Sequence, residues 1–189
     1  MLLAFFKPYG VLTQFTLDQP GQRTLADFGF PQRVYPLGRL DMDSEGLLLL
    51  SDEAGMNSKL LDPEAGHPRT YLAEVEGIPT REALQTLRKG GIDLKGHRTR
   101  ACDARLLESS PDLPPRDPPV RFRKSVPTSW LELTLTEGKN RQVRRMTAAV
   151  GFPTLRLVRV AIGKLRLGEM EPGTWHELAS ADRDLIWKR

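Results

Sequence analysis

Apolar residues along this chain fall into short blocks with two kinds of spacing. Residues 2–6 and 47–51 are almost unbroken apolar runs, and turn residues such as Pro8 and Gly46 bound them. Such runs are typical of strands that are buried on both faces. In residues 128–136 apolar and polar residues alternate instead, with leucine at 131, 133 and 135. This alternation predicts a strand buried on one face only. Further strands are predicted at residues 11–15, 69–76, 92–95, 99–107 and across 154–168.

Helical segments are short and are marked by capping residues. Thr24 predicts a short helix through Phe28, and Thr80 predicts a helix through Arg88 that Gly90 ends. The other helices are predicted near 53–61, at 140–150 with Asn140 as N-cap, and at the end of the chain after Ser180. Short β-hairpins mixed with single helices indicate an α/β (α+β) fold built on a mixed sheet.

Residues 108–127 are rich in proline, which prevents regular strand pairing and predicts an extended loop. Long loops in compact domains are usually functional or mobile. The arginines and lysine at its C-terminal end favour contact with RNA, and a flexible insertion is the alternative.

Composition narrows the class of protein. The chain has 189 residues, of which 39% are apolar, enough for one large or two small domains. Cys102 is the only cysteine, so an internal disulfide is excluded and a reducing, cytoplasmic location is expected. A packed, unreactive thiol is favoured there over a nucleophile. Three histidines and one cysteine also make a zinc site unfavourable. The first apolar run is too short for a signal peptide, and no run is long enough to span a membrane.

Charge is distributed unevenly along the chain. The net charge is only +4, but acidic residues dominate 41–76 while basic residues gather in 95–105, 116–124 and 139–145. Clustered Lys and Arg indicate a polyanionic partner, although many proteins carry solvated basic faces.

The loop at 36–46 contains candidate functional residues that allow several interpretations. Three acids alternate in it, Asp41, Asp43 and Glu45, directly before the apolar run. One interpretation is a catalytic carboxylate held beside Arg39, and another is a solvated acidic turn. A third is a calcium loop, since acids and a glycine fall at EF-hand positions. That match is poor, because Leu49 stands at a ligand position and the preceding helix is missing.

Three sequence blocks resemble one enzyme family. They are Gly38-Arg39-Leu40-Asp41-Met42-Asp43-Ser44-Glu45-Gly46, Thr70-Tyr71-Leu72-Ala73-Glu74-Val75 and Glu137-Gly138-Lys139-Asn140-Arg141-Gln142-Val143-Arg144-Arg145. In this order they resemble the pseudouridine synthases that modify ribosomal RNA, in the branch that shares an Arg-Leu-Asp motif. Residues 123–131 and 151–157 narrow the resemblance to members that act on the large ribosomal subunit.

The resemblance implies a fold and a reaction. It implies a central mixed, largely antiparallel sheet with flanking helices, forming one catalytic domain over 1–189 with two subdomains around a cleft. The small N-terminal RNA-binding domain of many relatives has no counterpart here. The expected activity is isomerisation of a uridine to pseudouridine in 23S ribosomal RNA, without cofactor or metal, by a monomer. Its partner is expected to be the RNA itself or a large-subunit assembly intermediate. The alternatives are another structured RNA, such as small-subunit rRNA or tRNA, and a non-catalytic RNA-binding or ribosome-assembly module.

The resemblance also assigns roles to residues. Asp41 is the catalytic carboxylate, Arg144 lies beside it, and Tyr71 lies against the target base, although a strand tyrosine is ordinarily a core residue. Arg39 fills the space that the flipped base leaves, or pairs with Asp43. Whether Asp41 attacks the sugar or removes a sugar proton stays open.

Neighbouring residues receive secondary roles. Asp43, Ser44 and Glu45 are expected to accept backbone hydrogen bonds that shape the loop, and an acid/base pair of Asp41 with Asp43 is the alternative. The remaining basic residues of the third block are expected to bind RNA phosphates: Lys139, Arg141 and Arg145.

Overall fold

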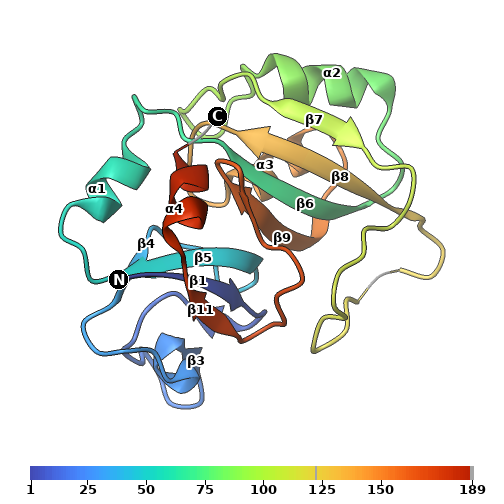
Figure 1. Ribbon diagram of the computed structural model, residues 1–189. Helices are drawn as coiled ribbons and strands as arrows, with labels where there is room; N and C mark the ends of the chain where they lie inside the picture. The colour runs from blue at the N-terminus through green and yellow to red at the C-terminus, as the bar shows by residue number, and fades with distance from the viewer. Residues whose placement is uncertain (122, 188–189) are drawn as a thin grey trace.

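The computed structural model describes residues 1–121 and 123–187 and contains one large sheet (Figure 1). Within these residues the sheet has nine strands, in the order β11-β1-β5-β9-β6-β8-β7, with β4 paired to β5 and β10 paired to β9. The strands are β1 Leu2–Lys7, β4 Tyr35–Leu37, β5 Glu45–Ser51, β6 Arg69–Glu76, β7 Asp103–Leu106, β8 Thr128–Leu135, β9 Thr154–Ile162, β10 Leu165–Arg166 and β11 Trp175–Glu177. A separate parallel pair joins β2 Val11–Leu12 to β3 Arg23–Thr24.

The sheet consists of two halves joined by one short contact. β5 and β9 run parallel and are in register only at Glu45 with Val158 and at Gly46 with Arg159, whereas the other pairs of this sheet are antiparallel. Gly46 has a φ of 107°. A Cβ there would collide with the carbonyl oxygen of Arg159. Glycine is therefore required at the point where the halves meet.

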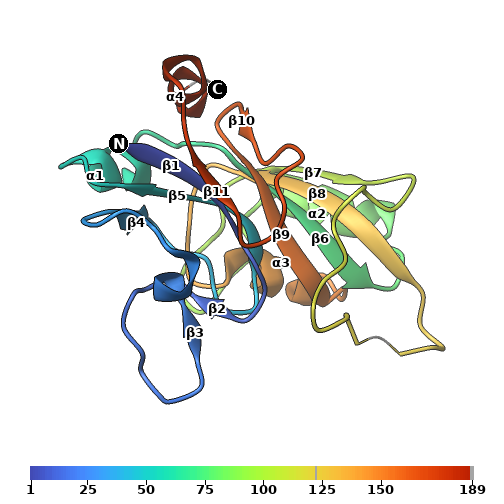
Figure 2. The ribbon, with the colours of Figure 1, turned by 60° about the horizontal axis from the view of Figure 1, so that its bottom comes forward.

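Four α-helices and one 3-10 helix flank the sheet in the described residues. They are η1 Leu25–Phe28, α1 Met56–Leu61, α2 Arg81–Lys89, α3 Gln142–Ala149 and α4 Ser180–Ile186. Figures 1 and 2 show α2 along the β7 edge and α3 under the β9 half, while α4 lies over the junction of the halves. Thr24 and Thr80 cap their helices through their side-chain oxygens, as the sequence predicts.

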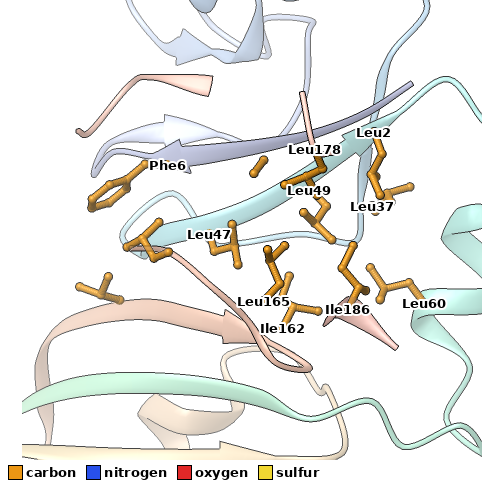
Figure 3. Close-up of a cluster of buried hydrophobic side chains, with 13 residues drawn as sticks. Leu2, Phe6, Leu37, Leu47, Leu49, Leu60, Ile162, Leu165, Leu178 and Ile186 are labelled. Atoms are coloured by element: carbon orange, nitrogen blue, oxygen red, sulfur yellow. The ribbon is translucent and has the colours of Figure 1, made fainter. Parts of the chain in front are cut away.

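Three apolar clusters hold these layers together. One packs β1, β5 and β9 against α1 and α4, and Figure 3 shows Leu47, Leu49, Ile162 and Ile186 within it. A second lies on the opposite face of β1 and β5. The third joins α2 and α3 to β6, β7 and β8. The alternation predicted for residues 128–136 is confirmed, because the three leucines of β8 that point inward are buried.

Several predicted boundaries are wrong. The strand predicted at 11–15 contains only two paired residues, and residues 92–95 form an isolated bridge between Asp93 and Arg98. Asn140 does not cap α3; Arg141 does, in a left-handed conformation with a φ of 50°. Ser180 is the first residue of α4, whose N-cap is Ala179. Residues 188–189, at the predicted end of that helix, lie outside the described residues.

The proline-rich segment between β7 and β8 has no regular structure at its described residues, as predicted. Figure 2 shows it as a long yellow loop that extends beyond the sheet. Arg156 donates to the Pro114 carbonyl at 2.8 Å, and the Arg116 guanidinium lies 4.1 Å from the centre of the Tyr9 ring. These contacts attach the loop to both halves. None of the helices in residues 1–121 and 123–187 has the length and apolar character to cross a membrane.

Candidate active site

A pocket of about 700 Å³ opens between the two halves of the sheet. The loop before β5, the strands β6 and β9, and the segment leading into α3 line it. Since β5 and β9 pair over only two residues, the strands separate beyond Gly46 and leave room for the pocket. The pocket brings together five of the predicted catalytic and RNA-binding residues: Arg39, Asp41, Tyr71, Lys139 and Arg141.

Asp41 lies in a loop that hydrogen bonds fix from several sides. The Thr13 hydroxyl donates to the Leu40 carbonyl at 2.6 Å and accepts from the Leu40 amide at 3.2 Å. The Ser44 amide donates to the Asp41 carbonyl at 3.0 Å. The Asp41 side chain stays about one-third exposed at the pocket. The backbone is therefore held firmly while the carboxylate remains accessible, as a reactive group requires.

Lys7, at the end of β1, contacts the loop that carries Asp41. Its ammonium is fully buried and donates to the carbonyls of Val11 at 2.7 Å, Pro8 at 3.0 Å and Met42 at 3.5 Å. Burial lowers the pKa of Lys7 to about 7, against the opposing charge of nearby acids such as Glu45. Sequence reasoning missed this role, because a single lysine at a strand end carries no pattern.

The stability of the protein is expected to depend on pH through Lys7. The unfolded chain keeps the Lys7 proton up to about pH 10.5, whereas the folded chain releases it near pH 7. Between these values the unfolded state binds one more proton, so the free energy of unfolding rises with pH, by up to about 1.4 kcal/mol per unit. Denaturant melts from pH 7 to 10 should show this rise in the wild type and not in Lys7→Met. Lys89→Met, at an exposed helical position, is the control and should keep the wild-type slope; equal slopes in all three proteins would refute the effect.

Two arginines of the third block surround Asp43. Arg141 donates to both Asp43 oxygens, at 2.8 and 2.7 Å, and lies 3.6 Å from the Asp41 carboxylate. Arg144 donates to the Asp43 carbonyl at 2.6 Å and the Thr154 carbonyl at 3.1 Å, and its Nε lies 3.4 Å from the Asp43 carboxylate. Burial would raise the pKa of Asp43, but the hydrogen bonds from Arg141 and the charge of Arg144 outweigh it and hold that pKa below its usual value.

This geometry corrects the predicted pairing. Among the described residues, the cation in ion-pair contact with Asp41 is Arg141, whereas Arg144 contacts Asp43. Arg141 therefore has acidic partners, contrary to its prediction as a phosphate-binding residue alone. The left-handed conformation of Arg141 begins α3 and directs its guanidinium to the acidic loop. The proposed pair of Arg39 with Asp43 is also wrong: the ion pairs found for Asp43 among the described residues involve Arg141 and Arg144.

Glu45 differs from its prediction as well. Its carboxylate accepts two hydrogen bonds from Arg156, at 2.8 and 2.9 Å, and both side chains are buried. It is therefore part of a buried ion pair that joins β5 to β9. This pair also removes Glu45 from any calcium loop, and no group of three or more acidic, histidine or cysteine side chains in the described residues is placed to hold a metal ion.

Tyr71 has the core contacts expected of a strand tyrosine and also faces the pocket. It lies on β6, packs against two apolar clusters and lines the pocket. Lys139 and Arg39 are exposed at the pocket, while Arg145 is half-buried on α3 and outside its lining. Cys102 donates to the Leu87 carbonyl at 3.2 Å, and burial raises the pKa of its thiol to about 11. That thiol is unreactive at neutral pH.

The pocket lining also includes Arg69 and Arg159, to which the sequence assigned no role, and Ser44, whose hydroxyl has no hydrogen-bond partner in the described residues, contrary to its prediction as a loop-shaping acceptor. Arg159 is almost fully buried. The signal available in the sequence was a charged residue inside an otherwise apolar strand, Leu157-Val158-Arg159-Val160. A solvated edge position produces the same pattern, so the signal was ambiguous.

Comparison with known proteins agrees with this architecture. A family model described as RNA pseudouridylate synthase matches residues 1–149. The chain therefore belongs to the RNA pseudouridylate synthase family and is an enzyme that isomerises uridine in RNA. The ribosomal large subunit pseudouridine synthase E of Xanthomonas axonopodis pv. citri (strain 306) is 58% identical over 173 residues, which cover 91% of this chain and 90% of that protein.

Two further matches support this result. The protein of the same name from Xanthomonas campestris pv. campestris is 56% identical over 176 residues, covering 93% of this chain and 94% of its own. A crystal structure of a pseudouridylate synthase has a TM-score of 0.80 at 24% identity and covers 98% of this chain and 73% of that one. The predicted fold is thereby confirmed.

Proposed function

We propose that this enzyme converts a uridine of large-subunit ribosomal RNA to pseudouridine, with Asp41 as the catalytic carboxylate. The observation that carries the proposal is the position of Asp41: an accessible carboxylate at a pocket that Tyr71 and several cations line. Non-catalytic RNA binding needs basic and aromatic groups but gains nothing from an acid facing a phosphate-rich ligand. The names of the two Xanthomonas relatives support the large subunit as the source of the RNA.

The proposed division of labour follows from the geometry. The target base leaves its stack and packs against the Tyr71 ring, a contact worth about 1–3 kcal/mol. Asp41 acts on the ribose, either at C1′ or on a sugar proton. Arg141 contacts Asp41 and orders Asp43, and Arg39 occupies the space that the base leaves. Lys139 and Arg145 bind flanking phosphates. The enzyme acts as a monomer with one catalytic domain of two subdomains around the pocket.

Mapping of pseudouridines tests the substrate directly. Ribosomal and transfer RNAs from cells with and without the gene are probed chemically, and the purified enzyme is then added back to the unmodified RNA. Loss and restoration of one site in large-subunit RNA is expected. If the lost pseudouridine instead lies in small-subunit RNA or tRNA, that RNA is the substrate and the large-subunit assignment is wrong. Comparing free RNA with assembly intermediates in the add-back reaction identifies the preferred form.

Arg144 is expected to position the catalytic loop. Its two carbonyl contacts join the loop at Asp43 to β9 at Thr154. Arg144→Met should therefore lower the single-turnover rate by about 10²-fold, the size expected for a 1 Å misplacement, while RNA affinity changes little. Arg144→Lys should retain partial activity, because one of the two hydrogen bonds remains. Reduced affinity with an unchanged rate for bound RNA would instead make Arg144 a phosphate contact.

RNA affinity is expected to fall steeply with salt, because bound phosphates release counterions. Replacing Lys139 or Arg145 with Gln should weaken binding and reduce the slope of log Kd against log salt by about 1 for each phosphate that the variant no longer neutralises. Filter binding at several salt concentrations measures this slope. Arg81→Gln, an exposed substitution on α2, serves as the control. If a variant has the same slope as the wild type, the replaced residue does not contact an RNA phosphate.

A further inference from the structure

Arg159 occupies an unusual position at the junction of the two sheet halves. Its Nε donates to the Leu47 carbonyl at 2.8 Å, where the β5–β9 ladder has already ended. The residue is only 4% exposed, and its Nη2 has no hydrogen-bond partner in residues 1–121 and 123–187. A buried guanidinium with an unused donor is costly, and such groups are normally satisfied.

Arg159 has no ion-pair partner among the described residues. No carboxylate forms an ion pair with Arg159 or Arg69 in the described part of the chain, although both line the pocket. Arg69 lies two residues before Tyr71 on β6, and Tyr71 is paired with Arg159 on β9. The buried Ser44 hydroxyl also lacks a hydrogen-bond partner in the residues that the structure describes, and Ser44 lines the same pocket. The wall is therefore suited to a ligand with electronegative oxygens.

The position of Tyr71 relative to Arg159 indicates how a base stacked on the Tyr71 ring would be oriented. The two residues are cross-strand partners on β6 and β9. Directly opposed residues in an antiparallel pair project from the same face, with Cβ atoms about 4.5–5.5 Å apart. Although the ladder is irregular just before Tyr71, both side chains line the pocket, so a planar base stacked on Tyr71 would present its edge toward Arg159.

We infer that Arg159 donates from Nη2 to a carbonyl oxygen of the target uracil and stabilises the base when it is detached. This inference deepens the proposed function and rests on it. Cleavage of the bond between C1′ and N1 leaves the electron pair on the uracil, whose negative charge is shared by N1, O2 and O4. The base then forms the bond from C5 to C1′, loses the C5 proton and gains a proton at N1. No electron is gained or lost overall, and a fixed cation at a carbonyl oxygen lowers the energy of the charged base.

A uracil oxygen fits this position better than a phosphate. Arg159 lies at the buried wall of the pocket, whereas the exposed cations Arg39 and Lys139 line its accessible part. A backbone phosphate would need to carry its full charge and its two sugar links to the wall. An uncharged base edge enters without that desolvation, and its charge develops only during the reaction.

Substrates with sulfur in place of one uracil oxygen test the contact in the intact enzyme. The mapping experiment identifies the target RNA, whatever its class, and short RNAs are made with uridine, 2-thiouridine or 4-thiouridine at that site. Sulfur is a poor acceptor, so single-turnover isomerisation by the wild type should slow about 10-fold or more at one of the two positions. Arg159→Met should be about 10²-fold slower on the uridine RNA and should lose this discrimination. Sulfur also changes the leaving base itself, but this effect is the same for the wild type and Arg159→Met. It therefore cancels when the sulfur effects on the two enzymes are compared as a ratio.

Controls separate this contact from a structural role. Arg166→Met removes an exposed arginine from the adjoining strand β10 and should leave rates and discrimination unchanged. If Arg159→Met melts too early to assay, Arg159→Lys is used, and its discrimination should also be reduced. Wild-type rates that ignore both sulfur substitutions, or an equal sulfur effect with and without Arg159, would overturn the inference. Failure of the large-subunit assignment alone would leave this test intact.

Discussion

Asp41→Asn is expected to abolish pseudouridine formation while the protein remains folded and binds RNA. The change keeps the size of the side chain but removes the negative charge that nucleophilic or base chemistry on the ribose needs. The single-turnover rate should fall by roughly 10⁴-fold or more, as when other enzymes lose a reactive group. The assay measures conversion of pre-bound RNA, with affinity and melting temperature determined in parallel.

Asp43→Asn is the matched control for this experiment. Its amide oxygen still accepts a hydrogen bond from Arg141, and the contact of Arg144 with the backbone carbonyl of residue 43 does not involve the side chain. Measurable activity should therefore remain. Wild-type turnover in excess chelator excludes the calcium alternative. Substantial pseudouridine formation by well-folded Asp41→Asn would contradict the assignment of the catalytic carboxylate.

Glu45→Gln is expected to lower the free energy of unfolding by about 3–5 kcal/mol. The Glu45 and Arg156 side chains are 3% and 7% exposed, and removal of one charge leaves the other buried without a partner. Arg156→Met should cost a similar amount and should also release the proline-rich loop at Pro114. The double variant Glu45→Gln/Arg156→Met should lose less than the sum of the single changes, because neither charge then remains. Urea denaturation of the four proteins measures this cycle.

The exposed pair of Arg105 with Glu132 provides the comparison. Its arginine side chain is 63% exposed, so Arg105→Met should lower the free energy of unfolding far less than Glu45→Gln does. A similar cost for Glu45→Gln and Arg105→Met would show that the buried pair does not hold β5 to β9.

The elements that sequence predicted well are those whose signals are local. β6 was predicted with its observed bounds, and β1, β5 and β8 nearly so, because unbroken or alternating apolar residues determine which faces can be buried. α2 followed from the Thr80 cap. The three-residue strands β4 and β11 were missed, since they exist by pairing with β5 and β1 rather than by their own composition.

In the candidate active site, too, local sequence signals located some residues and missed others. The loop around Asp41 and the strand of Tyr71 were found because contiguous motifs carry them. The ion pair of Arg141 with Asp41 was not predictable, because the resemblance placed Arg144 there and no local signal marks the left-handed conformation of Arg141.

The sequence by itself determined the family, the main strands and the presence of an acidic loop before β5. Only the tertiary structure decided which groups face that loop. Residues 112 positions apart, Leu47 and Arg159, meet because two residues of β5 pair with β9 at a glycine. That short contact both joins the halves of the sheet and opens the pocket between them. A pattern along the chain cannot encode it, because its geometry depends on where two strands stop pairing.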